Sequence, residues 1–202
     1  MTPEIAFGCQ MSIDDKGDFY HTTKVYSFIF NQHYKASIRF MLGLLNSKVL
    51  WFFLRSTGYV LRGGYYTFKT DYLRPFPIAA STPKQQKPIE SLVNYVLELH
   101  KASLNAGAEE SRARMASAYF EQLIDALVYE LYFPEEFTVS ERSLHTLLSS
   151  ERFPTPDAMK GVMTFFDRLF DSEHPVRQAL FFLDSSETVQ VIESKSRENH
   201  QD

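Results

Sequence analysis

The 202-residue chain has one cysteine, Cys9, which excludes an internal disulfide framework and a cysteine-based zinc site. We expect Cys9 to behave as a small buried hydrophobic residue in a reducing compartment. The best apolar run, residues 40–54, is interrupted by Asn46, Ser47 and Lys48 and is too short to span a bilayer. The first residues, MTPEIAFG, lack the basic start and apolar core of a signal peptide. We therefore expect a cytoplasmic protein.

Familiar catalytic motifs are also missing from the sequence. It has no glycine-rich phosphate or dinucleotide motif, no nucleophile elbow and no histidine pair at metal-binding spacing. The six histidines are scattered, and we expect His100 and His145 at helix surfaces or boundaries rather than as ligands. Asp184 with Glu193 and Lys195 is similar to a metal-nuclease pattern, which needs a strand that presents the last two residues. No partner strand is obvious, so we favour a solvated chain end there.

The composition, 44% hydrophobic and 15% aromatic, is ample for a packed core. Residues 1–31 predict a β-hairpin, in which a strand with alternating Ile5, Phe7 and Cys9 precedes a turn at 14–17 and a strand over 19–30. Apolar residues at steps of three and four predict one helix over Tyr34–Arg55, ended at residues 56–58. A loop over 59–64, a strand over 65–69 and a turn over 70–77 should follow.

The second half reads as helical after a linker over 79–88. A helix from Pro88, a break at 105–107 and a helix over about 109–132 predict an αα-hairpin. Short helices are expected at about 140–150, 156–170 and 175–183, then a short strand over 188–192 and a frayed end from Ser194. The fold class is thus α+β: a small N-terminal β-sheet with a packed helix, then a helical C-terminal half. We expect three parts: 1–80 an α/β recognition region, 81–137 the αα-hairpin, and 138–202 a short-helix extension.

Positive charge is concentrated in the first half. The whole chain has a net charge of −4, whereas Tyr34–Ile78 contains seven basic residues and one acidic residue, a net +6. The aromatic residues interleaved with these cations are Trp51, Tyr59, Tyr65, Tyr66, Phe68 and Tyr72. Trp51, Phe52, Phe53 and Phe76 are expected in the core. A local cationic excess with aromatic residues is typical of a surface that faces nucleic acid.

Arg62 is the strongest candidate for direct contact, because Gly63 and Gly64 beside it allow close approach to a ligand. Its guanidinium can donate two parallel hydrogen bonds to guanine or to a phosphate. We expect Arg62 and either Tyr65 or Tyr66 to read base edges. The remaining predicted DNA contacts, mainly to phosphates, are Lys48, Arg55, Lys69, Tyr72 and Arg74.

The stretch Gly43–Ile78 closely resembles the C-terminal target-recognition region of TaqI-like adenine-N6 DNA methyltransferases, including the fused type IIG restriction enzymes. The resemblance lies in the Leu-Gly-Leu-Leu-Asn-Ser-Lys pattern at 42–48, the paired glycines, Phe68-Lys69 and the Pro-Phe-Pro-Ile exit at 75–78. A later segment, Leu123–Tyr132, is also similar to a helix of such proteins. The resemblance covers about residues 1–137.

The resemblance implies a module that binds double-stranded DNA for a separate catalytic part. In the family, an Asn-Pro-Pro-Tyr-type motif holds the target adenine and a glycine-rich motif binds S-adenosylmethionine; neither occurs here. We therefore expect no cofactor in this chain, with S-adenosylmethionine and Mg²⁺ needed only in a methyltransferase or endonuclease domain or subunit, and no membrane partner. The alternative is a helical protein-interaction module that docks such a subunit without reading DNA.

Overall fold

The structure, a computed structural model, describes residues 1–29, 36–103, 110–137 and 143–197. It confirms the α+β class, with two small antiparallel sheets among many helices. The N-terminal elements are β1 (Thr2–Pro3), β2 (Ile5–Ala6), β3 (Val25–Tyr26), α1 (Ile38–Leu45), α2 (Lys48–Thr57), β4 (Tyr66–Thr67) and α3 (Thr70–Leu73). The remaining helices are α4 (Pro83–Ser103), α5 (Glu110–Tyr132), α6 (Pro134–Phe137), α7 (Leu144–Ser149), α8 (Met159–Phe170), α9 (Pro175–Asp184) and α10 (Glu187–Arg197).

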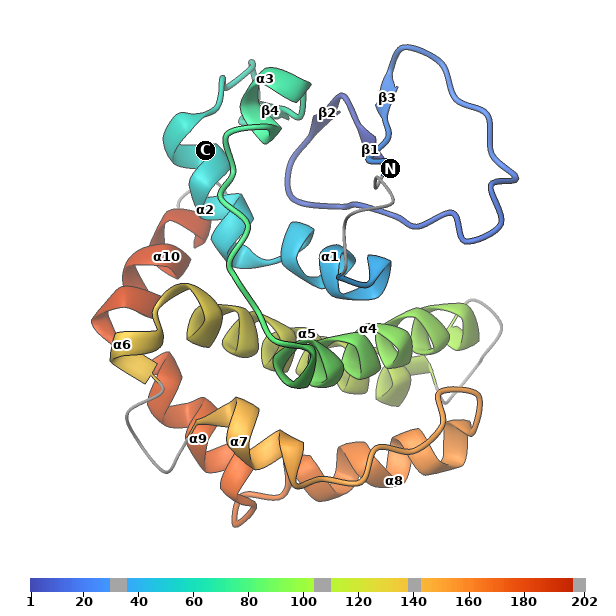
Figure 1. Cartoon of the computed structure of the whole chain (residues 1–202), viewed down its shortest axis with the longest axis vertical. Helices are drawn as coiled ribbons and strands as arrows, with labels where there is room; N and C mark the ends of the chain where they lie inside the picture. Colours follow the sequence, from blue (N-terminus) through green and yellow to red (C-terminus); the bar gives the residue numbers. More distant parts are fainter. Residues whose placement is uncertain (30–35, 104–109, 138–142, 198–202) are drawn as a thin grey trace.

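The helices α4 and α5 form the centre of the molecule. In Figure 1 they lie side by side across the middle, with the N-terminal elements above them and α7, α8 and α9 below. Tyr95, Phe120 and Leu127 of these two helices are fully buried. The predicted αα-hairpin is thereby confirmed, while its expected break at 105–107 lies outside the described residues.

Helix α4 begins at Pro83, five residues before the expected start at Pro88. A reciprocal cap explains the earlier start: the Gln85 amide donates to Thr82 Oγ1 and the Thr82 amide donates to Gln85 Oε1. Pro83 takes the first helical position, where its missing N–H costs nothing. The segment 79–88, predicted to be a linker, therefore contains the N-terminal cap of α4, Thr-Pro-Lys-Gln at 82–85.

The predicted N-terminal hairpin is wrong in its pairing. Segment 2–6 pairs with two different partners: Thr2 lies opposite Tyr26 in the β1–β3 sheet, and Ile5 lies opposite Thr67 in the β2–β4 sheet. Glu4 joins the two sheets, because its amide donates to the Lys24 carbonyl at 2.9 Å and its carbonyl accepts from the Phe68 amide at 2.7 Å. Segment 2–6 is thus held by β3 at its start and by β4, more distant in the sequence, at its end.

The single helix expected over residues 34–55 is also wrong, since the structure has two helices with a break at Asn46 and Ser47. Ser47 has an extended backbone and accepts from the Leu50 amide, so it caps α2. The Asn46 side chain bonds both backbone groups of Met11, at 2.7 and 2.9 Å. The Lys48 amide donates to Asp125 of α5 at 2.9 Å. Polar residues within an apolar run therefore mark the start of a second helix. Tyr34, the expected first residue of the single helix, lies outside the described residues.

The structure also tests four further expectations. Helix α2 ends at Thr57 with Gly58 as its cap, as predicted, whereas the turn expected over 70–77 contains the one-turn helix α3. The expected strand over 188–192 is wrong, because α10 runs through it. The same helix continues to Arg197, so the first residues of the expected frayed end are helical, and the rest of that end lies outside the described residues. Val189 and Ile192 are both buried, and a spacing of three places them on one helix face.

Buried side chains from both ends of the chain form one continuous core. Helix α1 packs on α4, and α10 packs on α2. The division at residues 80 and 137 stays a prediction. Among the described residues, no helix has the length and apolar character needed to cross a bilayer.

Candidate nucleic-acid interface

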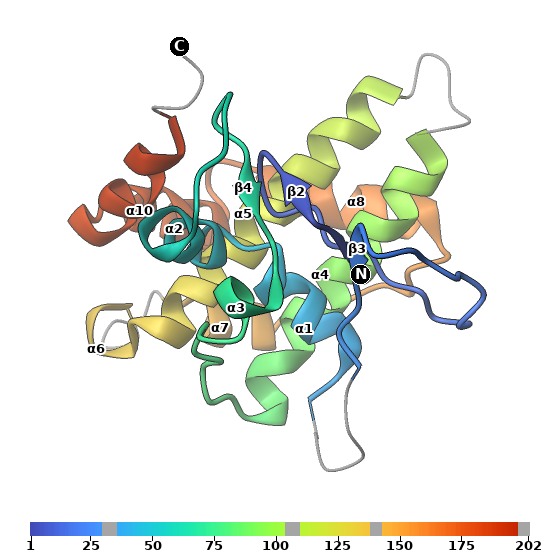
Figure 2. The same ribbon diagram turned by 90° about the horizontal axis from the view of Figure 1, so that it is seen from above.

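The paired glycines lie at the tip of a β-hairpin that continues β4. The Leu61 amide donates to the Tyr65 carbonyl at 2.6 Å, and Val60 pairs with Tyr66 across the hairpin. Gly63 and Gly64 have φ angles of +81° and +75°, a left-handed region that favours glycine. In Figure 2 this loop, between α2 and β4, extends away from both of these elements. Two glycines in sequence thus close a tight tip that carries Arg62.

Arg62 is exposed, and no carboxylate lies within ion-pair distance of it among the described residues. Tyr59 and Tyr65 beside it are also exposed. Tyr65 packs edge-on against Phe7, with ring centroids 5.6 Å apart. The tip therefore presents a guanidinium and two phenol rings to solvent, a combination suited to polar and stacking contacts.

The two tyrosines predicted as alternatives lie on opposite sides of the strand. Tyr66 is buried, with its ring edge-on to Trp51 at a centroid distance of 5.2 Å, and the Phe68 ring lies nearly parallel to the same indole at 6.4 Å. Because alternate strand residues point to opposite faces, Tyr65 is the one that faces outward. Trp51 and Phe68 act as the base on which the hairpin rests. Of the four aromatic residues expected in the core, Phe76 is buried, whereas Trp51, Phe52 and Phe53 are partly buried against it.

Lys69 and Arg74 follow the hairpin at the start and end of α3. Lys69 is half-exposed, with its Nζ 3.4 Å from Glu4 Oε1. Glu4 also pairs with Lys24 at 2.9 Å, and hydrogen bonding to Lys24 is the main reason why its pKa is lowered. Arg74 is exposed, while Tyr72 is half-buried against the core. Glu4 therefore pairs with two lysines, Lys24 and Lys69.

Lys48 and Arg55 are the two predicted DNA contacts on α2, and both are less exposed than Arg62 at the hairpin tip. Lys48 Nζ is 2.8 Å from Glu193 of α10 and 3.9 Å from Asp125 of α5. Arg55 is half-buried, and its Nε and Nη1 are covered without a hydrogen-bond partner in the part of the chain that the structure describes. A phosphate would have to compete with two carboxylates for Lys48, so its predicted DNA contact gains no support from its position.

The carboxylates around Lys48 line a polar cavity of about 620 Å³ between α5, α9 and α10. Burial raises the pKa of Asp125 to about 7, against the opposing effect of Lys48. Burial and nearby Glu193 also raise the pKa of Asp184. Tyr129 donates to Glu193 at 3.4 Å, and its own pKa is raised, chiefly by burial. The cluster therefore connects α2 to α10.

This cavity contains Asp184 and Glu193, two residues of the nuclease pattern. The strand that the pattern requires is absent, since both residues lie in helices. The described residues include no group of three or more histidine, cysteine or acidic side chains arranged to hold a metal ion. The nuclease interpretation therefore lacks the strand that it requires.

The remaining polar candidates have structural roles. His145 is buried at the start of α7, and its Nδ1 is 2.8 Å from Glu130. Glu130 also accepts from the amides of Leu144 and His145, so it caps α7 from the neighbouring α5. Cys9 is half-buried against the core, and burial raises the pKa of its thiol.

Sequence reasoning missed three residues at the hairpin. Tyr59 is exposed beside the tip, Phe7 supports Tyr65, and Glu4 holds Lys69 and joins the two sheets. If the paired glycines are taken as the hairpin tip, Tyr59 falls opposite Thr67, and the structure has this pairing. No local pattern indicates Phe7 or Glu4, since their roles depend on the pairing of β2 with β4.

The family comparison agrees with the resemblance seen in the sequence. Residues 1–78 match the family model of the TaqI-like C-terminal specificity domain. The match ends at Ile78, just after the Pro-Phe-Pro exit, and covers the hairpin, α1, α2 and both sheets. No curated protein and no solved structure matched the chain.

Proposed function

With residues 1–78 as a TaqI-like specificity domain, we propose that the chain is the DNA target-recognition module of an adenine-specific methyltransferase in a restriction-modification system. The observation that carries this proposal is the exposed Arg62 at a glycine-closed hairpin tip that rests on Trp51 and Phe68. A two-stranded ribbon fits the major groove of B-DNA, where base pairs present distinct donors and acceptors. A rigid base keeps the tip in one orientation when it enters the groove.

Within this proposal the residues divide into two roles. Arg62 offers two parallel donors to guanine, and Tyr65 and Tyr59 flank it with hydroxyl groups and ring faces. Lys69 and Arg74 lie beyond the base of the hairpin, where they would contact phosphates and set the register.

Catalysis is assigned to a partner domain or subunit, as in a type IIG enzyme. That partner would bind S-adenosylmethionine, hold the flipped adenine and, where cleavage occurs, bind Mg²⁺. This chain would fix the position of the duplex relative to that site. Both parts would act in the cytoplasm, where the DNA lies.

The test is a salt series of DNA-binding measurements on Arg62→Ala, Lys69→Ala and a control, Lys160→Ala. Lys160 is exposed on α8, below the α4–α5 layer in Figure 1, far from β4. Arg62→Ala should reduce preference between duplex sequences by about 1–3 kcal/mol. Lys69→Ala should weaken binding to all duplexes and reduce the salt slope by about one. The control should bind as the wild type does.

Two outcomes would contradict the proposal. If Arg62→Ala and Lys69→Ala both bind like the control, the hairpin does not contact DNA. If the wild-type chain shows no salt-dependent affinity, the interaction-module alternative replaces recognition, because a phosphate-binding surface must release counterions.

A further inference from the structure

Lys24 is a cation beside the candidate interface that no sequence pattern indicated. Its Nζ lies 2.9 Å from Glu4 Oε2, and Lys69 Nζ lies 3.4 Å from the other oxygen of the same carboxylate. The Lys24 and Lys69 side chains are 77% and 52% exposed, whereas the Glu4 side chain is 12% exposed. The carboxylate is therefore covered, while the two lysines that share it, called here the lysine pair, are open to solvent.

The backbone around Glu4 places one lysine on each side of it. The Glu4 amide donates to the Lys24 carbonyl, and the Glu4 carbonyl accepts from the amide of Phe68, the residue before Lys69. Figure 2 shows β3, β2 and β4 next to one another, in agreement with the strand pairing. The hairpin that carries Arg62 continues β4, so the lysine pair and the hairpin tip belong to the same group of strands.

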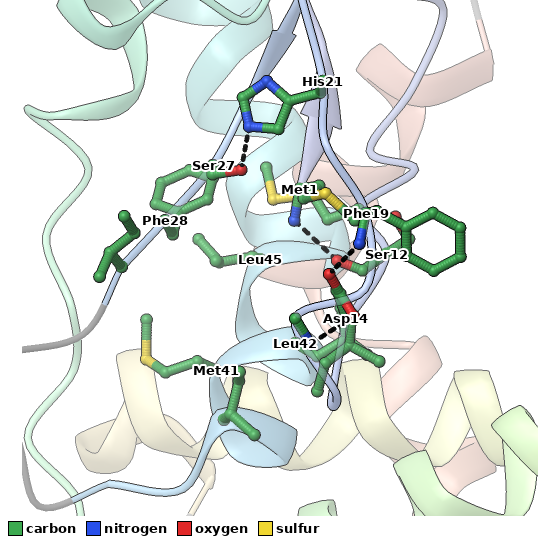
Figure 3. A pocket seen from close by; sticks show the side chains of 15 residues that line it. Met1, Ser12, Asp14, Phe19, His21, Ser27, Phe28, Met41, Leu42 and Leu45 are labelled. Atoms are coloured by element: carbon green, nitrogen blue, oxygen red, sulfur yellow. Dashed lines mark hydrogen bonds between the residues drawn. The ribbon is translucent and has the colours of Figure 1, made fainter.

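A closed turn fixes the backbone of Lys24. The Val25 amide donates to the Thr22 carbonyl at 3.2 Å. Figure 3 shows the His21 ring hydrogen-bonded to the Ser27 hydroxyl across the same turn, at 2.6 Å. The strand β3 that begins after Lys24 pairs with β1. The Lys24 side chain therefore starts from a defined position beside Glu4.

The charge of the strands that meet here is positive after every carboxylate is counted. Hydrogen bonding to Glu4 is the main reason why the pKa of Lys24 is raised, so its ammonium is charged at neutral pH. Segments 2–6, 24–26 and 59–74 contain four cations and two carboxylates, a net charge of +2, in a chain with a net charge of −4. These six groups are Lys24, Arg62, Lys69, Arg74, Glu4 and Asp71. A positive region of this kind favours an anionic partner.

An ammonium group has three donors, and the contact with Glu4 occupies at most one of them on each lysine. We propose that the lysine pair is a phosphate-binding site, in which Lys24 and Lys69 each contact a phosphate of duplex DNA while Glu4 lies behind them. This rests on the proposed function and extends its DNA contacts from the hairpin to the turn before β3. Because phosphate contacts carry no base information directly, Lys24 contributes to affinity and not to base preference.

The test measures the affinity of the full chain for a mixed-sequence duplex at salt concentrations from about 50 to 200 mM. Lys24→Ala removes one phosphate contact and should reduce the salt slope by about 0.9, so over this range wild type should lose about 3.5-fold more affinity than the variant. Lys24→Arg keeps the charge and should keep the wild-type slope. Lys24→Ala combined with Lys69→Ala should reduce the slope by about twice as much as Lys24→Ala alone.

The matched control is Lys101→Ala. The Lys101 side chain is 70% exposed and its Nζ lies 2.7 Å from Glu98, so it is a lysine of similar exposure in a similar ion pair. Lys101 lies near the C-terminal end of α4, at the right of Figure 1, whereas β4 and α3 lie at the upper left. Lys101→Ala should have the salt slope of wild type.

Three results would overturn the proposal: Lys24→Ala has the slope of the control, Lys24→Arg is as defective as Lys24→Ala, or the double variant loses no more slope than Lys24→Ala. In each case the proposed function still stands if Arg62→Ala reduces base preference. A wild-type chain without salt-dependent affinity would instead remove the proposed function, and the phosphate-binding site with it.

Discussion

Asp125 is the residue whose substitution most directly tests the polar cluster between α2, α5 and α10. Its side chain is 14% exposed, it accepts from the Lys48 amide, and it lies 3.9 Å from Lys48 Nζ. Burial raises its pKa from 3.8 to about 7. In the change Asp125→Asn, the amide oxygen can still accept from the Lys48 backbone while the buried charge disappears.

The sign of the effect follows from proton binding. The unfolded chain releases the Asp125 proton near pH 4, whereas the folded protein holds it until about pH 7. The folded state therefore binds more protons between these values, and stability falls as pH rises through that window. One pKa unit corresponds to about 1.4 kcal/mol, so Asp125 should lower the free energy of unfolding by about 3 kcal/mol more at pH 8 than at pH 5.

Urea denaturation of wild type and Asp125→Asn at several pH values from 5 to 8 measures this difference. The variant should be the more stable protein at pH 8, and its advantage should shrink by about 3 kcal/mol towards pH 5. The conservative control is Asp167→Asn, since Asp167 is an exposed partner of Arg112 and such pairs contribute little. A stability difference between wild type and Asp125→Asn that does not change with pH would refute the reasoning.

Two further predictions concern strain and a buried cap. Gly64→Ala should cost about 1–2 kcal/mol, because φ is +75° and the new Cβ would lie 3.1 Å from Phe7. In thermal unfolding, Gly64→Ala should lower the melting temperature more than Gly17→Ala does, because Gly17 has a similar φ of +71° but open space around it. Equal shifts in melting temperature would exclude a role for Phe7. Glu130→Gln should cost about 3 kcal/mol in urea denaturation, since its amide group leaves buried donors of α7 and His145 unpaired. A loss under 1 kcal/mol would mean that the cap is replaceable.

The parts of the fold that could be predicted depend on local patterns. The apolar stripes of α4 and α5, the stop at Gly58 and the glycine-closed loop each reflect residues within a few positions of one another. The position of Arg62 at an exposed tip follows from the same local rule, since paired glycines favour a tight turn. Local chemistry was therefore sufficient for the helical hairpin and for the centre of the candidate interface.

The parts that could not be predicted depend on distant contacts. The break before α2 is stabilised by Asp125, 77 positions from Lys48, and an apolar periodicity cannot report that contact. The pairing of β2 with β4 joins Ile5 to Thr67. For α10, Val189 and Ile192 fit a short strand as well as a helix, and burial against the rest of the core decides between them. The acidic neighbours of Lys48 also lie in distant parts of the chain, in α5 and α10, so local sequence does not report them and its predicted DNA contact stays a prediction.

The acidic second half is consistent with the DNA-binding role proposed for the first half, once the contacts of its carboxylates are considered. Helix α2 carries Trp51, on which Tyr66 and Phe68 of the hairpin strand rest. The other side of α2 contacts α5 and α10, where the carboxylates of Asp125 and Glu193 meet Lys48. Part of the negative charge is thus used internally to hold the helix that supports the hairpin. Under the proposed function, a groove-reading tip needs a fixed orientation more than it needs additional cations, so the helical half would contribute to recognition by positioning α2 rather than by contacting DNA.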